Sequence, residues 1–125
     1  MSRDLASQHP PRVRPILTVG VTGHRRLTVE SLEPLKRSTE IILRELAHDA
    51  RSVAADHLDV FETPDPQLTL LSGLAMGADQ IGAAVALEQG WSLDAVLPFA
   101  VEEYAHDFAG ATADNFSRLL AQTRH

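Results

Sequence analysis

The chain has 125 residues, a formal net charge of −6 and no cysteine. This length predicts a single domain with one layered core. The acidic balance argues against general nucleic-acid binding, which needs many phosphate-neutralising Lys and Arg side chains. The lack of cysteine excludes disulfides, thiolate nucleophiles and cysteine-ligated zinc. No apolar run of membrane-spanning length and no secretory leader is present, so we expect a soluble cytoplasmic protein without a membrane partner.

The first fifteen residues, MSRDLASQHPPRVRP, mix charged side chains with prolines and show no apolar period. They predict a mobile arm over residues 1–15, followed by one domain over residues 16–125. The domain opens with ILTVGVTG, a β-branched run that begins at Ile16 and is apolar at nearly every position. Such a run is typical of a central parallel strand that is covered on both faces.

An amphipathic helix is expected in SLEPLKRSTEIILRELAHDA. Ser31 is its candidate N-cap, because Pro34 would then fall in the first turn, where a missing N–H costs no helical hydrogen bond. The apolar stripe of this helix consists of Leu35, Thr39, Ile42, Leu46 and Ala50. After it, the short apolar piece LDVF (58–61) fits either an edge strand or a packed loop.

Two more strand–helix pairs follow. LTLLS (68–72) predicts a strand, and ADQIGAAVALEQG predicts a helix from about Ala78 that ends at Gly90, with small residues that let it lie close to the sheet. SLDAVLPF (92–99) predicts a third strand. The last helix is expected from about Thr112, with Phe116, Leu119 and Leu120 facing inward.

This alternation predicts an α/β fold, specifically a Rossmann-like three-layer αβα sandwich with a mostly parallel sheet. Three strands make a thin sheet. A naturally short protein, a sheet truncated at its C-terminal side and a sheet completed by a partner are all open explanations.

Ligands of open α/β sheets collect outside the carboxyl ends of the strands. The loop after the first strand, TGHRR, places Thr22, Gly23, His24 and Arg25 there. Gly23 would let the main chain approach an anion, and Arg25 suits bidentate contact with a phosphate. Solvated loop residues, Arg26 included, are an alternative of about equal weight.

The loop after the second strand, SGLAMGAD, is the stronger signal. Gly73 and Gly77 bracket a turn into a helix, whose first N–H groups favour an anion such as phosphate. Asp79 opposes phosphate there, and a helix cap is its simplest role; contact with ribose hydroxyls or an ion pair with Arg25 are the alternatives. Met76 fits an apolar loop contact or a cover for a flat base.

The loop after the third strand carries an acidic group with Glu102, Glu103 and Asp107. Solvated side chains are the usual explanation, and a general acid or base is the alternative. The histidines lack zinc-site spacing, and neither a Walker loop nor a full dinucleotide fingerprint is present, so no metal and no cofactor are expected. Trp91 is interpreted as a packing anchor.

The segments VGVTGHRRL, LLSGLAMGADQIGAAVALEQG and LPFAVEEYAHDF together resemble the SLOG superfamily over residues 16–120, in particular its uncharacterised bacterial branch with TGHR and SGLAxGAD motifs. This Rossmann-like group includes the Lonely-guy phosphoribohydrolases and the DNA-processing protein A domain. The resemblance implies binding or sensing of a nucleotide or nucleotide-derived molecule where the first two loops meet. The expected ligand-binding residues are Thr22, Gly23, His24, Arg25, Ser72, Gly73, Leu74, Met76, Gly77, Asp79 and Glu103.

The chain lacks the P-G-G-x-G-T loop and the following catalytic Glu of the Lonely-guy enzymes, which speaks against hydrolysis, and the catalytic residues are left unassigned. A homo-oligomer and a fused effector domain are both compatible with a sensing role. The alternatives are a phosphoribohydrolase-type enzyme that uses Glu102 or Glu103, and a non-catalytic assembly module.

Overall fold

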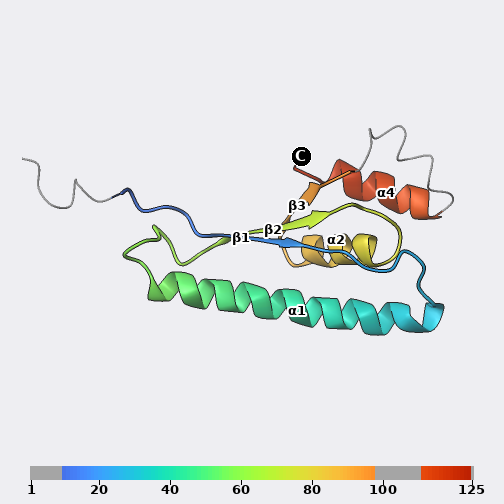
Figure 1. Ribbon diagram of the computed structural model, residues 1–125, viewed down its shortest axis with the longest axis horizontal. Helices are drawn as coiled ribbons and strands as arrows, with labels where there is room; N and C mark the ends of the chain where they lie inside the picture. Colours follow the sequence, from blue (N-terminus) through green and yellow to red (C-terminus); the bar gives the residue numbers. More distant parts are fainter. Residues whose placement is uncertain (1–9, 98–110, 125) are drawn as a thin grey trace, which may run out of the picture.

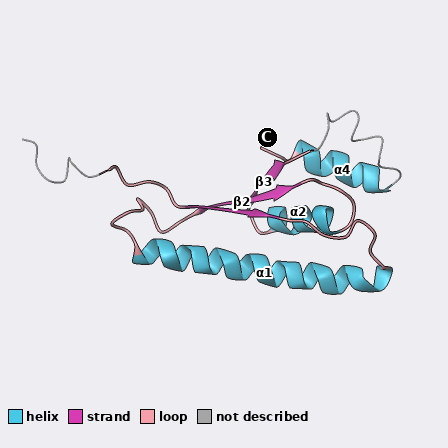
Figure 2. Cartoon of the chain, viewed as in Figure 1, coloured by secondary structure: helices cyan, strands magenta, loops and turns pink. Residues whose placement is uncertain are grey.

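The structure is a computed structural model, and it describes residues 10–97 and 111–124. Helices and strands alternate along the chain (Figures 1 and 2). Their order is β1 (Ile16–Gly20), α1 (Val29–Asp56), β2 (Gln67–Ser72), α2 (Ala78–Glu88), β3 (Ser92–Ala95) and α4 (Ala111–Ala121). The predicted α/β class is therefore confirmed.

Within residues 10–97 and 111–124, the sheet has three parallel strands in the order β1-β2-β3. Among these strands β2 is central, and β1 lies at an edge. The prediction that the first strand is central and covered on both faces is therefore wrong, and Ile16, Thr18 and Gly20 are exposed. The other residues of the strand, Leu17 and Val19, pack against the core.

The helices form a layer centred on α2. Both crossovers step in the same direction across the sheet, so right-handed connections place α1 and α2 on the same face. α2 contacts α1 and α4 as well as β2 and β3, and Figure 1 shows it between the other two helices. Over the described ranges this amounts to one helix layer on one sheet face, and the three-layer arrangement stays a prediction.

Small residues bring α2 close to the sheet, as expected from the sequence. A Cβ added at Gly82 would lie 3.0 Å from the Val21 side chain. Ala83 and Ala86 are fully buried in the main core cluster. Gly90, with a φ of +84°, follows the helix in the left-handed conformation expected of a C-terminal cap. Trp91, with 3% exposure, is a packing anchor as interpreted.

α1 is longer than predicted and begins earlier. Thr28 is the N-cap residue in place of Ser31, whose hydroxyl instead donates to the Thr28 carbonyl at 2.8 Å. Pro34 consequently lies in the second turn. With 28 residues, α1 spans about 42 Å, whereas the five residues of β1 span about 17 Å. The helix therefore extends past the sheet, as Figure 1 shows.

The residues just before β1 are tied to the domain, unlike the expected arm. The Val13 amide donates to the Val60 carbonyl at 3.1 Å, and the Glu62 amide donates to the Val13 carbonyl at 2.9 Å. A single bridge joins Val13 to Phe61, so LDVF is a turn that ends on one bridging residue. Residues 1–9 lie outside the described part of the chain.

α4 begins at Ala111, and its Phe116 and Leu119 side chains are buried, as the apolar pattern predicted. Leu120 is half-buried against the same core. The chain after α4 returns to β3, where the Arg124 amide donates to the Leu93 carbonyl at 2.8 Å. The Arg124 guanidinium also makes a two-bonded ion pair with Asp94, and this contact raises the pKa of Arg124.

Candidate functional site

The loops that leave β1 and β2 are in direct contact. The Ala78 amide, the first of α2, donates to the His24 carbonyl at 3.1 Å. A Cβ added at Gly23 would lie 2.6 Å from the Ala78 Cβ, closer than real Cβ atoms approach. Because the carboxyl ends of neighbouring parallel strands lie at the same end of the sheet, these two loops form a single surface.

Gly77 is required at this contact for two separate reasons. Its φ of +86° lies in the left-handed region, which side chains disfavour. In addition, an added Cβ would clash with the His24 carbonyl oxygen and would lie 2.6 Å from the Arg25 carbonyl oxygen. Gly77 therefore allows the backbone of the first loop to lie directly against the start of α2.

The amides at the start of α2 are less available than the sequence suggested. The Ala78 amide is bonded to His24, the Gln80 amide donates to the Ala75 carbonyl at 3.2 Å, and the Ile81 amide donates to the Gly77 carbonyl at 3.1 Å. An anion at this helix end would therefore meet few free N–H groups, and it would depend more on cationic side chains than we expected.

The turn between β2 and α2 is held by a chain of buried and partly buried hydrogen bonds. The Ser72 hydroxyl accepts from the Leu74 amide and donates to the Asp79 carbonyl, both at 3.0 Å. The Gln80 side-chain amide donates to the Leu74 carbonyl at 3.1 Å. Ser72 and Gln80 thus fix the turn from its two ends.

Leu74 is the strained residue of this turn. Its φ of +57° is left-handed, which costs a side-chain-bearing residue about 1–2 kcal/mol, and its side chain is fully buried. Sequence reasoning missed both this conformation and Gln80, which is 7% exposed on a helix otherwise rich in Ala. The burial of Gln80 could have been predicted, because it is a lone side-chain amide among small residues. Nothing in the local sequence indicated the left-handed conformation of Leu74.

Asp79 lies half-buried in the first turn of α2. Burial raises the pKa of its carboxyl, while a hydrogen bond with the Ala75 backbone and the positive charge of Arg25 act in the opposite direction. Gly77 occupies the N-cap position of this helix, and the Asp79 carboxyl bonds to the Ala75 backbone just ahead of it. Arg25 acts on Asp79 through its charge rather than through a direct ion pair.

The predicted binding residues that the structure describes fall into three groups by exposure. Thr22, Gly23, His24 and Arg25 are exposed, and Gly73, Met76, Gly77 and Asp79 are half-buried. Ser72 and Leu74 are buried and support the turn instead of facing outward. Glu103 and the other acidic residues of the third loop lie outside the described residues.

A hollow of about 370 Å³ reaches Gly77 from the helix side. It lies between the start of α1, α2 and α4, with Leu32 and Ile81 among its apolar residues. Lys36 and Arg118 add positive charge to its wall, and Glu33 adds a carboxylate. The Lys36 ammonium is 3.8 Å from Glu88, a distance that leaves it free to exchange partners.

Comparison of the chain with family models, with curated proteins and with solved structures gave no match in any of the three. Within residues 10–97 and 111–124, no group of three or more His, Asp or Glu side chains is placed to hold a metal ion. Over the same part of the chain, none of the helices combines the length and the apolar character needed to cross a membrane.

Proposed function

We propose that this chain binds a nucleotide or nucleotide-derived molecule in the cytoplasm, as a SLOG-like domain of Rossmann type. The supporting observation is the contact between the two loops at the carboxyl ends of β1 and β2, which brings Arg25 and Asp79 to one surface. Open α/β sheets bind their ligands at this end, outside the carboxyl ends of the strands.

Arg25 and Asp79 suit different parts of such a ligand. The exposed guanidinium of Arg25 offers paired N–H donors to a phosphate, and the His24 ring next to it adds a further donor. Asp79 repels phosphate but accepts hydrogen bonds from ribose hydroxyls. Because burial has already removed part of its water, those bonds replace lost solvation.

Met76 fits the remaining part of the ligand. It is half-buried between Ala75 and Gly77, within the turn that precedes α2. A flexible thioether adapts to the face of a flat ring, and the same residue packs against the core on its other side. The proposed order along the surface is phosphate at Arg25, ribose at Asp79 and base at Met76.

Calorimetric titration with nucleoside monophosphates, dinucleotides and cyclic nucleotides tests this function. We expect one member of the panel to bind, and Arg25→Ala to weaken that binding at least tenfold. Arg37→Ala, which removes an exposed guanidinium from α1, is the matched control and should leave affinity unchanged. Equal losses in the two variants, or binding of no panel member, would contradict the proposal.

Asp79→Asn separates the ribose contact from the phosphate contact. If Asp79 binds ribose hydroxyls, this variant should lose affinity for nucleotides but keep its affinity for inorganic phosphate. Loss of both would place Asp79 in a structural role. Hydrolysis is not part of the proposal, since Glu102 and Glu103 lie outside the described residues.

A further inference from the structure

β1 presents an outer edge with no described strand beside it. The Pro15 carbonyl accepts from Gln67 at 2.9 Å, and the Val21 amide donates to the Leu71 carbonyl at 3.0 Å. In a parallel ladder, alternate residues bond to the neighbouring strand, so the residues between them direct their N–H and C=O groups outward. Ile16, Thr18 and Gly20 are therefore in position to pair with another strand.

An apolar flank of α1 lies on the same side of the molecule. Leu35, Ile42, Leu46 and Val53 follow one another at intervals of seven, four and seven residues, which places them on one helix stripe. The side chains of Ile42 and Val53 are 57% and 53% exposed. α2 contacts the other flank of α1, where the Gln89 side chain donates to the Glu40 carbonyl at 2.9 Å.

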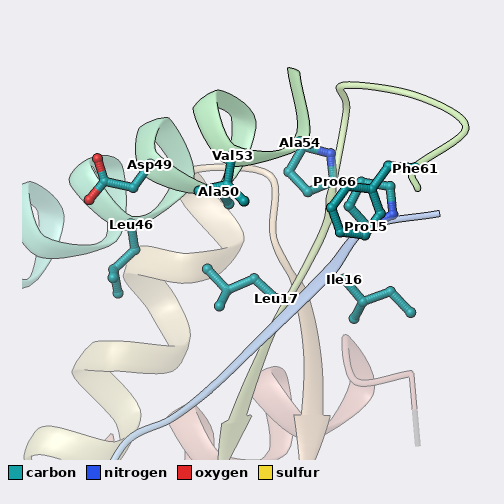
Figure 3. Close-up of a pocket in the computed structure, with 10 residues that line it drawn as sticks. All are labelled: Pro15, Ile16, Leu17, Leu46, Asp49, Ala50, Val53, Ala54, Phe61 and Pro66. Carbon is teal, nitrogen blue, oxygen red and sulfur yellow. The ribbon is translucent and has the colours of Figure 1, made fainter. Parts of the chain in front are cut away.

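A hollow of about 300 Å³ joins this flank to β1. Figure 3 shows Leu46, Ala50 and Val53 on the side of α1 that faces the strand, with Leu17 opposite them. The lining is almost entirely apolar, and Asp49 is its one ionisable residue. The sheet edge and the helix flank thus form one continuous surface that the described residues leave uncovered, and we call it the β1–α1 face.

We propose that the β1–α1 face binds a second copy of this chain, so that two sheets join through antiparallel β1 strands. Pairing centred on Thr18 sets Thr18 against its own counterpart and Ile16 against Gly20 of the partner. Each of these pairs uses the outward backbone groups and exchanges two hydrogen bonds. An isologous contact of this kind needs a self-complementary surface.

The side chains of β1 meet that requirement. Ile16 is 64% exposed and bulky, whereas no atom lies within 4 Å of the position that a Cβ would occupy at Gly20. Antiparallel pairing sets this large side chain beside that free space, twice by symmetry. A twofold axis perpendicular to the sheet places the helix layers of both copies on the same face of the joined sheet. The two α1 flanks then meet, and each covers Ile42 and Val53 of the other.

Asp49 predicts how association of the two copies depends on salt. It is exposed on the same flank, and the twofold axis brings it toward its counterpart. Like charges at a shared surface repel, and salt screens them. Association should therefore strengthen at high salt, and Asp49→Asn should strengthen it at low salt.

Sedimentation equilibrium of the full chain, at low and high salt, tests the proposal. We expect a monomer–dimer equilibrium that Thr18→Pro weakens at least tenfold, because proline removes an outward N–H that β2 does not use. Thr18→Val keeps that N–H and is the matched control. Ile42→Lys tests the helix flank independently of the strand and should weaken association to a similar extent, with an unchanged circular dichroism spectrum.

A position-specific readout comes from the absence of native cysteine. Thr18→Cys should be captured as a dimer by a short bismaleimide, whereas Arg37→Cys, far from the axis, should not. A chain that stays monomeric at every concentration and salt level would overturn the proposal, as would a dimer that persists in both Thr18→Pro and Ile42→Lys. Capture of a different polypeptide at the β1 edge by a monomeric chain would equally overturn it.

Discussion

The turn from β2 to α2 and the outer edge of β1 lie on the same sheet and differ in how completely their backbone groups are used. At the turn, hydrogen bonds through Ser72 and Gln80 fix a strained Leu74, and Gly77 lies against a carbonyl of the first loop. At the edge, Ile16, Thr18 and Gly20 direct their backbone groups away from β2. The contrast indicates a preformed surface at the turn and an open one at the edge.

Gly77→Ala should show the largest effect. The added Cβ clashes with the His24 carbonyl, and the alanine also has to adopt a left-handed backbone conformation. We therefore expect a loss of about 3 kcal/mol or more in the free energy of unfolding. Gly20→Ala makes the same change on the open edge and should stay within about 0.5 kcal/mol of the wild type. Urea denaturation measures both, and equal losses would refute the contrast.

Leu74→Ala should come next. Its side chain is fully buried, and loss of a buried Leu side chain typically costs about 2–5 kcal/mol. Ile41→Ala, at a position that is 56% exposed, is the control and should change stability by less than about 0.5 kcal/mol. Thermal and urea unfolding should agree in this ranking. An unchanged stability of Leu74→Ala would mean that the turn relaxes to fill the space that the Leu74 side chain leaves.

Gln80→Leu should have an intermediate effect. The change keeps most of the side-chain volume but leaves the Leu74 carbonyl without its donor, which costs about 1–3 kcal/mol when the carbonyl is buried. Hydrogen exchange at Leu74 and Ala75 should become faster than in the wild type, while exchange in β3 stays the same. Unchanged exchange at the turn would show that Gln80 does not hold it.

Asp79→Asn should have the smallest effect and is the only change here that depends on pH. Because burial raises the pKa of Asp79, the folded protein disfavours the ionised carboxyl. The stability that comes from the protonated form is present at low pH and is lost as pH rises through the folded pKa. The variant should therefore melt slightly above the wild type at neutral pH, and the difference should shrink on acidification. A variant that melts below the wild type at neutral pH would show that the charge is stabilising.

The alternation of strands and helices could be predicted from the sequence because each apolar pattern is local. The end of α2 at Gly90 and the small residues on its sheet-facing side were predictable for the same reason. The edge position of β1 was not, since ILTVG is equally apolar in a central strand and strand order depends on distant segments.

Among the candidate site residues, the sequence anticipated that the loops holding Gly23 and Gly77 belong together, and the contact at Ala78 shows them side by side. It did not anticipate that internal carbonyls would occupy several helix N–H groups. It also did not identify Thr28 and Gly77 as the N-cap residues, neither of which makes a side-chain cap hydrogen bond. Such choices depend on loop geometry, which residue type alone does not specify.

Trp91 has a practical consequence. It is the single tryptophan of the chain, it is 3% exposed, and it stands between α2 and β3 with its indole N–H unbonded within the described structure. Fluorescence excited at the indole band therefore reports on one junction, and its emission should shift to the red when that junction opens to water. The protein carries its own optical probe, and a shift that precedes loss of helical signal would show that the α2–β3 junction opens before the helices unfold.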